Sequence, residues 1–142
     1  MKINWNRVIL GGLLAGLVIN ICEYVENGLI LGDQWTRAIV RLQRPAMGAD
    51  STAAFLLWGF LVGIYALWLY AVLRPRLGPG PKTAAFAGIA VWVLASLLGS
   101  IPPVAMHLFP YHLIGIGIVV SLVENVVGTI LGAWLYKEPA AT

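Results

Sequence analysis

The chain has 142 residues, of which 60% are hydrophobic and only 11% are charged, whereas a soluble domain carries about 25% charged residues. This composition excludes a soluble globular domain, and the high hydrophobicity and single cysteine also exclude a disordered chain and a disulfide scaffold. The chain is therefore expected to be an integral membrane protein. Its net charge of +3 comes from basic residues that follow the membrane topology, which argues against a nucleic-acid partner.

Four apolar segments follow one another along the chain, separated by charged residues and by proline. A transmembrane helix needs about 20 apolar residues, and the uncharged stretch 83–123 is too long for one crossing. Pro102 and Pro103 divide that stretch, because proline lacks the backbone N–H and disfavours helix in the preceding residue. The predicted spans are 8–31, 51–73, 83–101 and 112–136. The expected fold class is an all-α antiparallel four-transmembrane-helix bundle that forms a single membrane domain over residues 1–142.

The loop between the first two spans contains a short amphipathic pattern over 34–44. Asp33 is a candidate N-cap before it, and Pro45 ends it. Apolar residues recur at helical spacing and arginines occupy the other face: Trp35, Ala38, Ile39 and Leu42 against Arg37, Arg41 and Arg44. This segment is predicted to be an interfacial helix, which either anchors the loop at the lipid headgroups or forms a lid over an outward-facing pocket.

Lysine and arginine set the expected orientation, because cytoplasmic loops carry the excess of basic residues. With the N-terminus inside, the basic residues on the cytoplasmic side are Lys2, Arg7, Arg74, Arg76, Lys82 and Lys137, and those outside are Arg37, Arg41 and Arg44. Both termini are therefore expected in the cytoplasm, with the lipid bilayer as the principal partner.

Carboxyl and amide side chains within the spans are the most informative residues, because a carboxylate at the bilayer centre costs about 2.5–3.5 kcal/mol. Asn20, Glu23, Tyr24 and Asn27 share a helical stripe on the first span. Glu124 lies near the middle of the last span. The predicted ligand or ion pocket, open to the outer side, comprises Asn20, Glu23, Tyr24, Asn27, Ser121, Glu124 and Asn125, and its outer rim comprises Glu26, His107 and His112.

No lysine or arginine lies at the depth of Glu124 in any span, so a proton, a bound cation or an amide must balance this carboxyl group. Burial favours the uncharged form of a carboxyl group. We therefore expect a site that binds or transports a proton, a cation or a small polar solute. The alternative is a non-catalytic accessory or assembly subunit of a larger membrane complex, in which the same Glu and Asn residues only hold helices together.

Motifs for catalysis or metal binding do not stand out in the sequence. Neither Glu23 nor Glu124 is followed three residues later by histidine, as a di-iron bundle requires, and no Ser-His-Asp set, phosphate loop or nucleotide motif is present. We expect no cofactor, no metal and no catalytic residue, which favours a protein that is not an enzyme. A zinc site from Glu26, His107 and His112 is the one metal arrangement that the residues allow.

Small residues four apart occur on every span and predict close helix packing: Gly12/Gly16, Gly28/Gly32, Gly59/Gly63, Ala95/Gly99 and Gly128/Gly132. These pairs also lead us to expect a homo-oligomer or a larger membrane complex. Spans two and four both end in Trp-Leu-Tyr, at 68–70 and 134–136. This repeat indicates either a duplicated hairpin or two independent aromatic belts at the membrane interface.

Several short runs together resemble a group of small bacterial four-span membrane proteins with no assigned activity: Gly11–Gly16, Trp68–Pro75, Gly80–Lys82 and Leu131–Glu138. The resemblance covers most of the chain, although its motifs are packing and boundary elements. It implies a location in the bacterial inner membrane and no particular activity.

Overall fold

The computed structural model describes residues 3–137. These residues form helices and connecting turns, with no strand among them. In chain order the elements are α1 (Trp5–Glu23), the π-helix η1 (Tyr24–Ile30), α2 (Gly32–Arg41), α3 (Ala49–Leu77), α4 (Pro81–Trp92), the π-helix η2 (Val93–Leu98), α5 (Ile101–Ala105) and α6 (Tyr111–Trp134).

Four helical segments are long and apolar enough to cross a membrane, which indicates a multi-pass membrane protein. These segments are Trp5–Ile30, Ala49–Leu77, Pro81–Ala105 and Tyr111–Trp134. They correspond to the four predicted spans, with ends that differ by a few residues. The second segment continues four residues past its predicted end, because Pro75 lies inside α3 rather than ending it.

The third segment does not end where the paired prolines predicted. The chain turns at Gly99 and Ser100, after the π-helix η2, and α5 then begins at Ile101. Pro102 and Pro103 lie in the first turn of α5. Backbone N–H groups in the first turn have no acceptor within the helix, so proline costs no hydrogen bond there. The prolines therefore help to start a helix at this end of the molecule.

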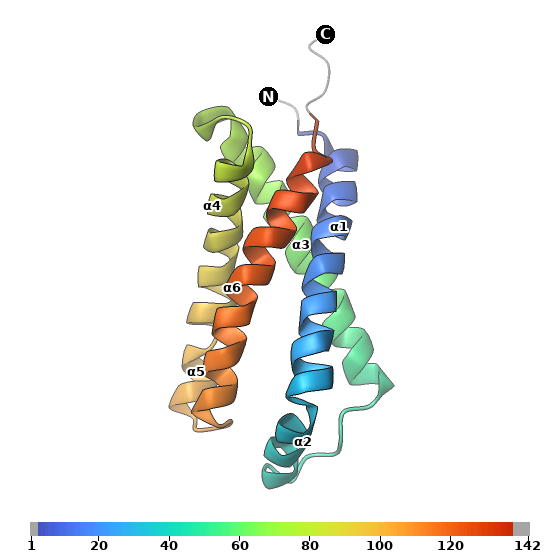
Figure 1. Cartoon of the computed structure of the whole chain (residues 1–142), viewed down its shortest axis with the longest axis vertical. Helices are drawn as coiled ribbons and strands as arrows, with labels where there is room; N and C mark the ends of the chain where they lie inside the picture. The colour runs from blue at the N-terminus through green and yellow to red at the C-terminus, as the bar shows by residue number, and fades with distance from the viewer. Residues whose placement is uncertain (1–2, 138–142) are drawn as a thin grey trace.

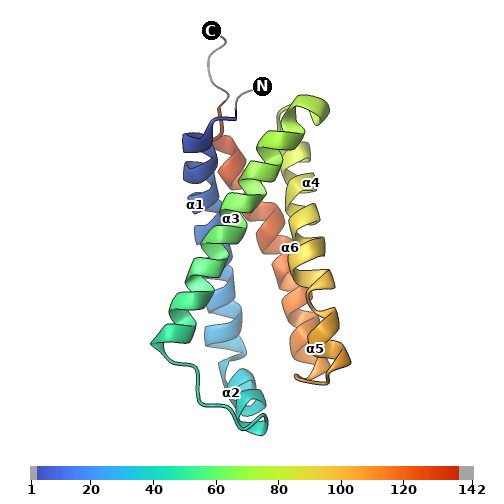
Figure 2. The same cartoon turned by 180° about the vertical axis from the view of Figure 1, so that it is seen from behind.

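The start of α1 and the end of α6 lie at one end of the bundle, called here the terminal end, and α2 and α5 lie at the opposite end, called here the α2/α5 end (Figure 1). The helix α1 packs against α3 and α6, and α4 packs against α6 and α3. At the terminal end α3 and α4 approach each other, and toward the α2/α5 end they diverge (Figure 2). The tightest packing is thus near the termini.

Glycines account for this tight packing. A Cβ atom added to Gly11 would lie 2.5 Å from the carbonyl oxygen of Gly132 on α6, and one added to Gly63 would lie 2.5 Å from that of Gly12 on α1. Only glycine allows the backbones to approach so closely in an apolar solvent. The pairs Gly12/Gly16, Gly59/Gly63 and Gly128/Gly132 are thus used within the chain itself.

The two halves of the chain follow the same order of elements: a helix, a π-helix, a short helix and a long helix. Each half ends in a buried tyrosine, and the rings of Tyr70 and Tyr136 pack edge to face with centroids 5.8 Å apart. The backbone N–H of Gly80 donates to the Tyr70 hydroxyl (3.3 Å), and that of Asn4 donates to the Tyr136 hydroxyl (3.5 Å). Each tyrosine therefore contacts the start of the other half's first helix, an exchange that favours the duplicated-hairpin interpretation.

The predicted amphipathic helix at 34–44 is present as α2, Gly32–Arg41. Its N-cap residue is Leu31, so Asp33 occupies the first turn, where a carboxylate favours the helix dipole. Ala38 is buried, and the Trp35 ring packs edge to face on Phe109 with centroids 5.3 Å apart. The apolar face of α2 thus packs against the chain itself, and its arginines are exposed.

Candidate functional site

Three glutamates gather where the end of α1 and the π-helix η1 face α6. Glu124 on α6 is only 2% exposed and Glu26 in η1 is 5% exposed, while Glu23 at the end of α1 is half-buried. Both Glu23 and Glu26 are close enough to Glu124 to interact with it electrostatically. The chain therefore concentrates acidic groups at one level inside an apolar bundle.

The burial of Glu26 follows from helical geometry. Glu26 is 18 residues after the buried Val8 (26 − 8 = 18), which is about five turns at 3.6 residues per turn, so both face the same way. The backbone N–H of Leu31 donates to the Glu26 carbonyl at 2.8 Å, one of the wider turns that define η1. On α6, a Cβ at Gly117 would lie 4.0 Å from Glu26 Oε1. The Glu26 carboxyl group thus lies beside α6 at the level of Gly117.

A chain of hydrogen bonds connects α2 to the end of α1 at this site. The Trp35 indole N–H donates to Asn27 Oδ1 at 2.7 Å, and Asn27 Nδ2 donates to Glu23 Oε2 at 2.6 Å. The carboxyl group of Glu124 on α6 lies close enough to that of Glu23 to share a hydrogen bond with it, and such a bond requires a proton on one of the two groups.

Several buried acceptor atoms within the described chain have no hydrogen-bond partner. They are both carboxyl oxygens of Glu26, Oε2 of Glu124 and Oδ1 of Asn125. A buried polar atom without a partner costs about 1–3 kcal/mol, and more if it is charged. No lysine or arginine occurs between Arg7 and Arg37 or between Lys82 and Lys137. The site therefore has more acceptors than donors, and chemically it is suited to a proton or a cationic N–H donor.

The three carboxyl groups do not form a metal centre. Within residues 3–137, no three His, Cys, Asp or Glu side chains are placed so that they could hold a metal ion. His107 shares a hydrogen bond of 2.7 Å with the Tyr111 hydroxyl, and His112 shares one of 2.9 Å with Gln34. Both histidines are exposed at the α2/α5 end, as a rim requires, but Glu26 is inside the bundle. Its assignment to the outer rim, and the zinc site built on it, are therefore corrected by its burial.

Some of the residues predicted to line the pocket bind the backbone instead. Asn20 donates to the carbonyl oxygen of Leu56 on α3 at 3.1 Å. Ser121 and Asn125 are buried on α6 and donate to carbonyls of α6 itself, at 3.1 and 2.8 Å. Tyr24 is 64% exposed, so it does not join the buried group. The structure thus brings together Glu23, Asn27 and Glu124 from the predicted pocket and adds Glu26.

Two residues that the pocket prediction left out belong to the site. Trp35 donates a hydrogen bond to Asn27, and Cys22 is half-buried and close enough to interact electrostatically with Glu23, Glu26 and Glu124.

The chain matches no known protein-family model, no curated protein and no solved structure. The function is therefore inferred from the chemistry of these side chains.

Proposed function

We propose that this protein binds a small monovalent cation within the membrane, at the site formed by Glu23, Glu26 and Glu124, in exchange for a proton. Glu26 carries the proposal, because both of its carboxyl oxygens are buried and have no partner in the described chain. A residue that only held helices together would use its oxygens in hydrogen bonds, as Glu23 does with Asn27. The assembly role therefore explains Glu23 but leaves Glu26 without a purpose.

The exchange follows from the balance of charges at the site. In the empty site, a charged Glu26 would be an unpaired buried ion, which is strongly disfavoured, so the carboxyl group keeps its proton. A bound cation supplies the missing positive charge and stabilises the carboxylate. Cation and proton thus compete for the same group, with Glu23, Glu124 and the Cys22 thiol as the titratable neighbours that influence it.

In the membrane we propose an antiparallel arrangement of the four spans, with the terminal end in the cytoplasm and the α2/α5 end outside. The basic residues support this orientation: of those within residues 3–137, Arg7, Arg74, Arg76, Lys82 and Lys137 lie near the terminal end, and Arg37, Arg41 and Arg44 near the other. The resemblance to bacterial proteins supports the inner membrane. Cysteine-accessibility mapping that placed residues 76–80 outside would reverse the orientation.

We also propose that the chain associates with itself or with a larger membrane complex. The pairs of small residues give little support to this association, because most of the glycine pairs already contact neighbouring helices of the same chain. What remains is the slim bundle itself, which has 22% of the most apolar part of its third span buried. Native mass spectrometry that showed only monomers in nanodiscs would refute the association.

Cation binding can be measured directly by titrating methylammonium, Na⁺ and K⁺ into protein in phosphatidylcholine nanodiscs, with calorimetric detection. The wild type is expected to bind at least one of these cations, and Glu26→Gln is expected to weaken that binding about tenfold or more, because it removes the ionisable oxygen. The matched control is Asp33→Asn, the same change at an exposed position of α2.

Two outcomes would contradict the proposed function. The first is a wild type that binds none of the three cations. The second is a folded Glu26→Gln variant that binds as tightly as the wild type and Asp33→Asn, which would leave the assembly role as the better explanation.

A further inference from the structure

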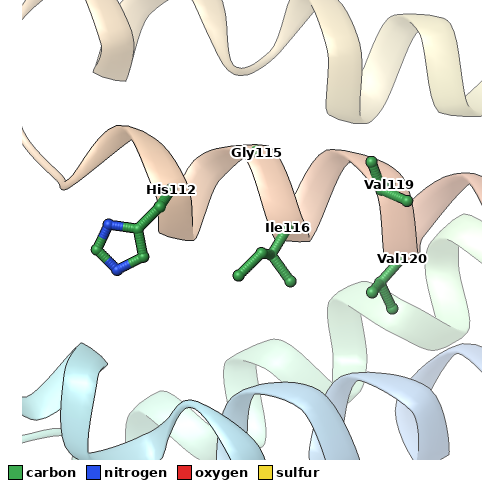
Figure 3. Close-up of a pocket in the computed structure, with 5 residues that line it drawn as sticks. All are labelled: His112, Gly115, Ile116, Val119 and Val120. Atoms are coloured by element: carbon green, nitrogen blue, oxygen red, sulfur yellow. The ribbon is translucent and has the colours of Figure 1, made fainter.

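The helix α2 is held against the rest of the chain along one of its sides. On that side the Trp35 ring packs on Phe109, and Ala38 is buried. His112, near the start of α6, points toward α2 (Figure 3), and its Nε2 shares a hydrogen bond of 2.9 Å with Gln34 Oε1. These contacts fix the helix in place, so the direction in which its opposite side faces is also fixed.

Three arginines occupy that opposite side of the α2 segment. Arg37 and Arg41 are one helical turn apart. Arg44 follows the helix, and its backbone N–H donates to the carbonyl oxygen of Ile39 at 3.3 Å, which holds it beside the last turn. All three arginines are exposed, and none of them forms an ion pair or a side-chain hydrogen bond within residues 3–137. They are called here the arginine face.

The arginine face carries an excess of positive charge. Asp33 is the one carboxylate in the segment 32–44, which has a net charge of +2. It lies in the first turn of α2, about 12 Å from Arg41 along the helix axis at 1.5 Å per residue. A guanidinium group binds best to an anion that accepts two parallel N–H bonds, as a phosphate does. The arginine face is therefore suited to phosphate groups.

Exposed apolar side chains place the arginine face at the edge of the lipid-facing surface. Leu29 and Ile30, at the end of η1, are exposed, and α2 begins two residues after them. Phe55 and Leu57, in the first turns of α3, are exposed as well. In a chain with four apolar helices long enough to span a membrane, such side chains contact the lipid acyl chains. The phosphate groups nearest to the arginine face are then those of phospholipids.

We propose that the arginine face binds the phosphate groups of anionic phospholipids, so that phosphatidylglycerol is enriched beside α2 over phosphatidylcholine. The preference follows from charge complementarity. The choline group of phosphatidylcholine is a cation, which the arginines repel, whereas the headgroup of phosphatidylglycerol leaves its phosphate charge uncompensated. This interaction surface is separate from the glutamate site and does not depend on cation binding there.

A fluorophore beside the arginine face tests the proposal. Val40 is exposed on α2, and Val40→Cys in a Cys22→Ala background provides a single position for the label. The labelled protein is placed in phosphatidylcholine nanodiscs that contain a small fraction of lipid with a spin label on its acyl chain. That lipid is either phosphatidylglycerol or phosphatidylcholine, and the ratio of the two quenching signals measures the local enrichment. The matched control is Arg76→Gln, which removes an exposed arginine at the terminal end.

Stronger quenching by phosphatidylglycerol is expected when the three arginines are present. Arg41→Gln should lower the enrichment by up to about fivefold, because a basic residue near an anionic surface contributes about 1 kcal/mol. Replacing Arg37, Arg41 and Arg44 together by glutamine should abolish the enrichment, and Arg76→Gln should leave it unchanged. Circular dichroism confirms that each variant is folded.

Equal quenching by the two lipids, or an enrichment that persists without the three arginines, would overturn the proposal. An enrichment that inorganic phosphate abolishes, at an ionic strength where sodium chloride does not, would also overturn it, because the arginine face would then bind free phosphate.

Discussion

Replacing Gly63 by alanine provides a quantitative test of the helix packing. The added Cβ would lie 2.5 Å from the carbonyl oxygen of Gly12, whereas ordinary contact begins at 3.4 Å. This atom and the still closer backbone nitrogen of Gly16 both belong to α1, so α1 and α3 must separate by at least about 0.9 Å (3.4 − 2.5) to relieve the overlap. Overpacking of this kind costs about 1–3 kcal/mol, and the better helix propensity of alanine returns about 0.5–1 kcal/mol. Gly63→Ala should therefore lower the free energy of unfolding by up to about 2.5 kcal/mol and leave it about 1–3 kcal/mol below that of Gly115→Ala, which has the same propensity gain without the overlap.

The control for this prediction is Gly115→Ala, where the new Cβ meets no atom within 4 Å. This variant keeps the gain in helix propensity without the overlap and should be as stable as the wild type or more stable by about 0.5–1 kcal/mol. Reversible unfolding by SDS in mixed micelles, followed by circular dichroism, measures both variants. Equal stability of Gly63→Ala and Gly115→Ala would refute the packing described for α1 and α3.

The remaining predictions concern the polar groups. Glu124→Gln preserves a donor toward Glu23 and should change the free energy of unfolding by less than about 1 kcal/mol. The same variant should abolish cation-dependent flux in liposomes. Loss of folding, measured by thermal denaturation, would contradict this prediction. Tyr136→Phe removes the hydroxyl that accepts from Asn4 and should destabilise the protein by about 0.5–1.5 kcal/mol, which chemical denaturation would detect. Cation affinity should rise with pH, because the cation displaces a proton, by up to about tenfold per pH unit; an affinity that is flat between pH 5 and about pH 9 would exclude the exchange.

The number and extent of the apolar helices could be predicted from the sequence, because charge and hydropathy act on each segment independently of its neighbours. The amphipathic segment at 34–44 likewise folds as a helix, since its periodicity is local. The paired prolines do not end the third segment, because proline disrupts the interior of a helix but is tolerated in its first turn, and the sequence pattern does not distinguish these two positions.

The composition of the site was harder to predict. Helical spacing correctly places Asn20, Glu23, Tyr24 and Asn27 along one side of the first span. It does not predict which of them are buried, because burial depends on where α3 and α6 pack around that span. Asn20 contacts α3, whereas Glu23 contacts α6. The signal for Glu26 was present in its spacing from the buried residues of α1, which places it on their face.

Hydrogen bonds between distant parts of the chain were out of reach of sequence patterns. The indole of Trp35 reaches Asn27 because α2 folds back beside η1, and no periodicity encodes that turn. The approach of Glu26 to Gly117 on α6 similarly depends on how η1 and α6 pack together. Such contacts follow from tertiary packing rather than from local pattern.

Proton release on cation binding tests the exchange at Glu26 most directly. Calorimetric titration of methylammonium into the wild-type protein, repeated in buffers of different ionisation enthalpy, gives the number of protons released for each cation bound. The proposed exchange predicts the release of about one proton by the wild type and none by Glu26→Gln, because the cation takes the place of the proton on that carboxyl group. Methylammonium binding by the wild type with no proton release would contradict it.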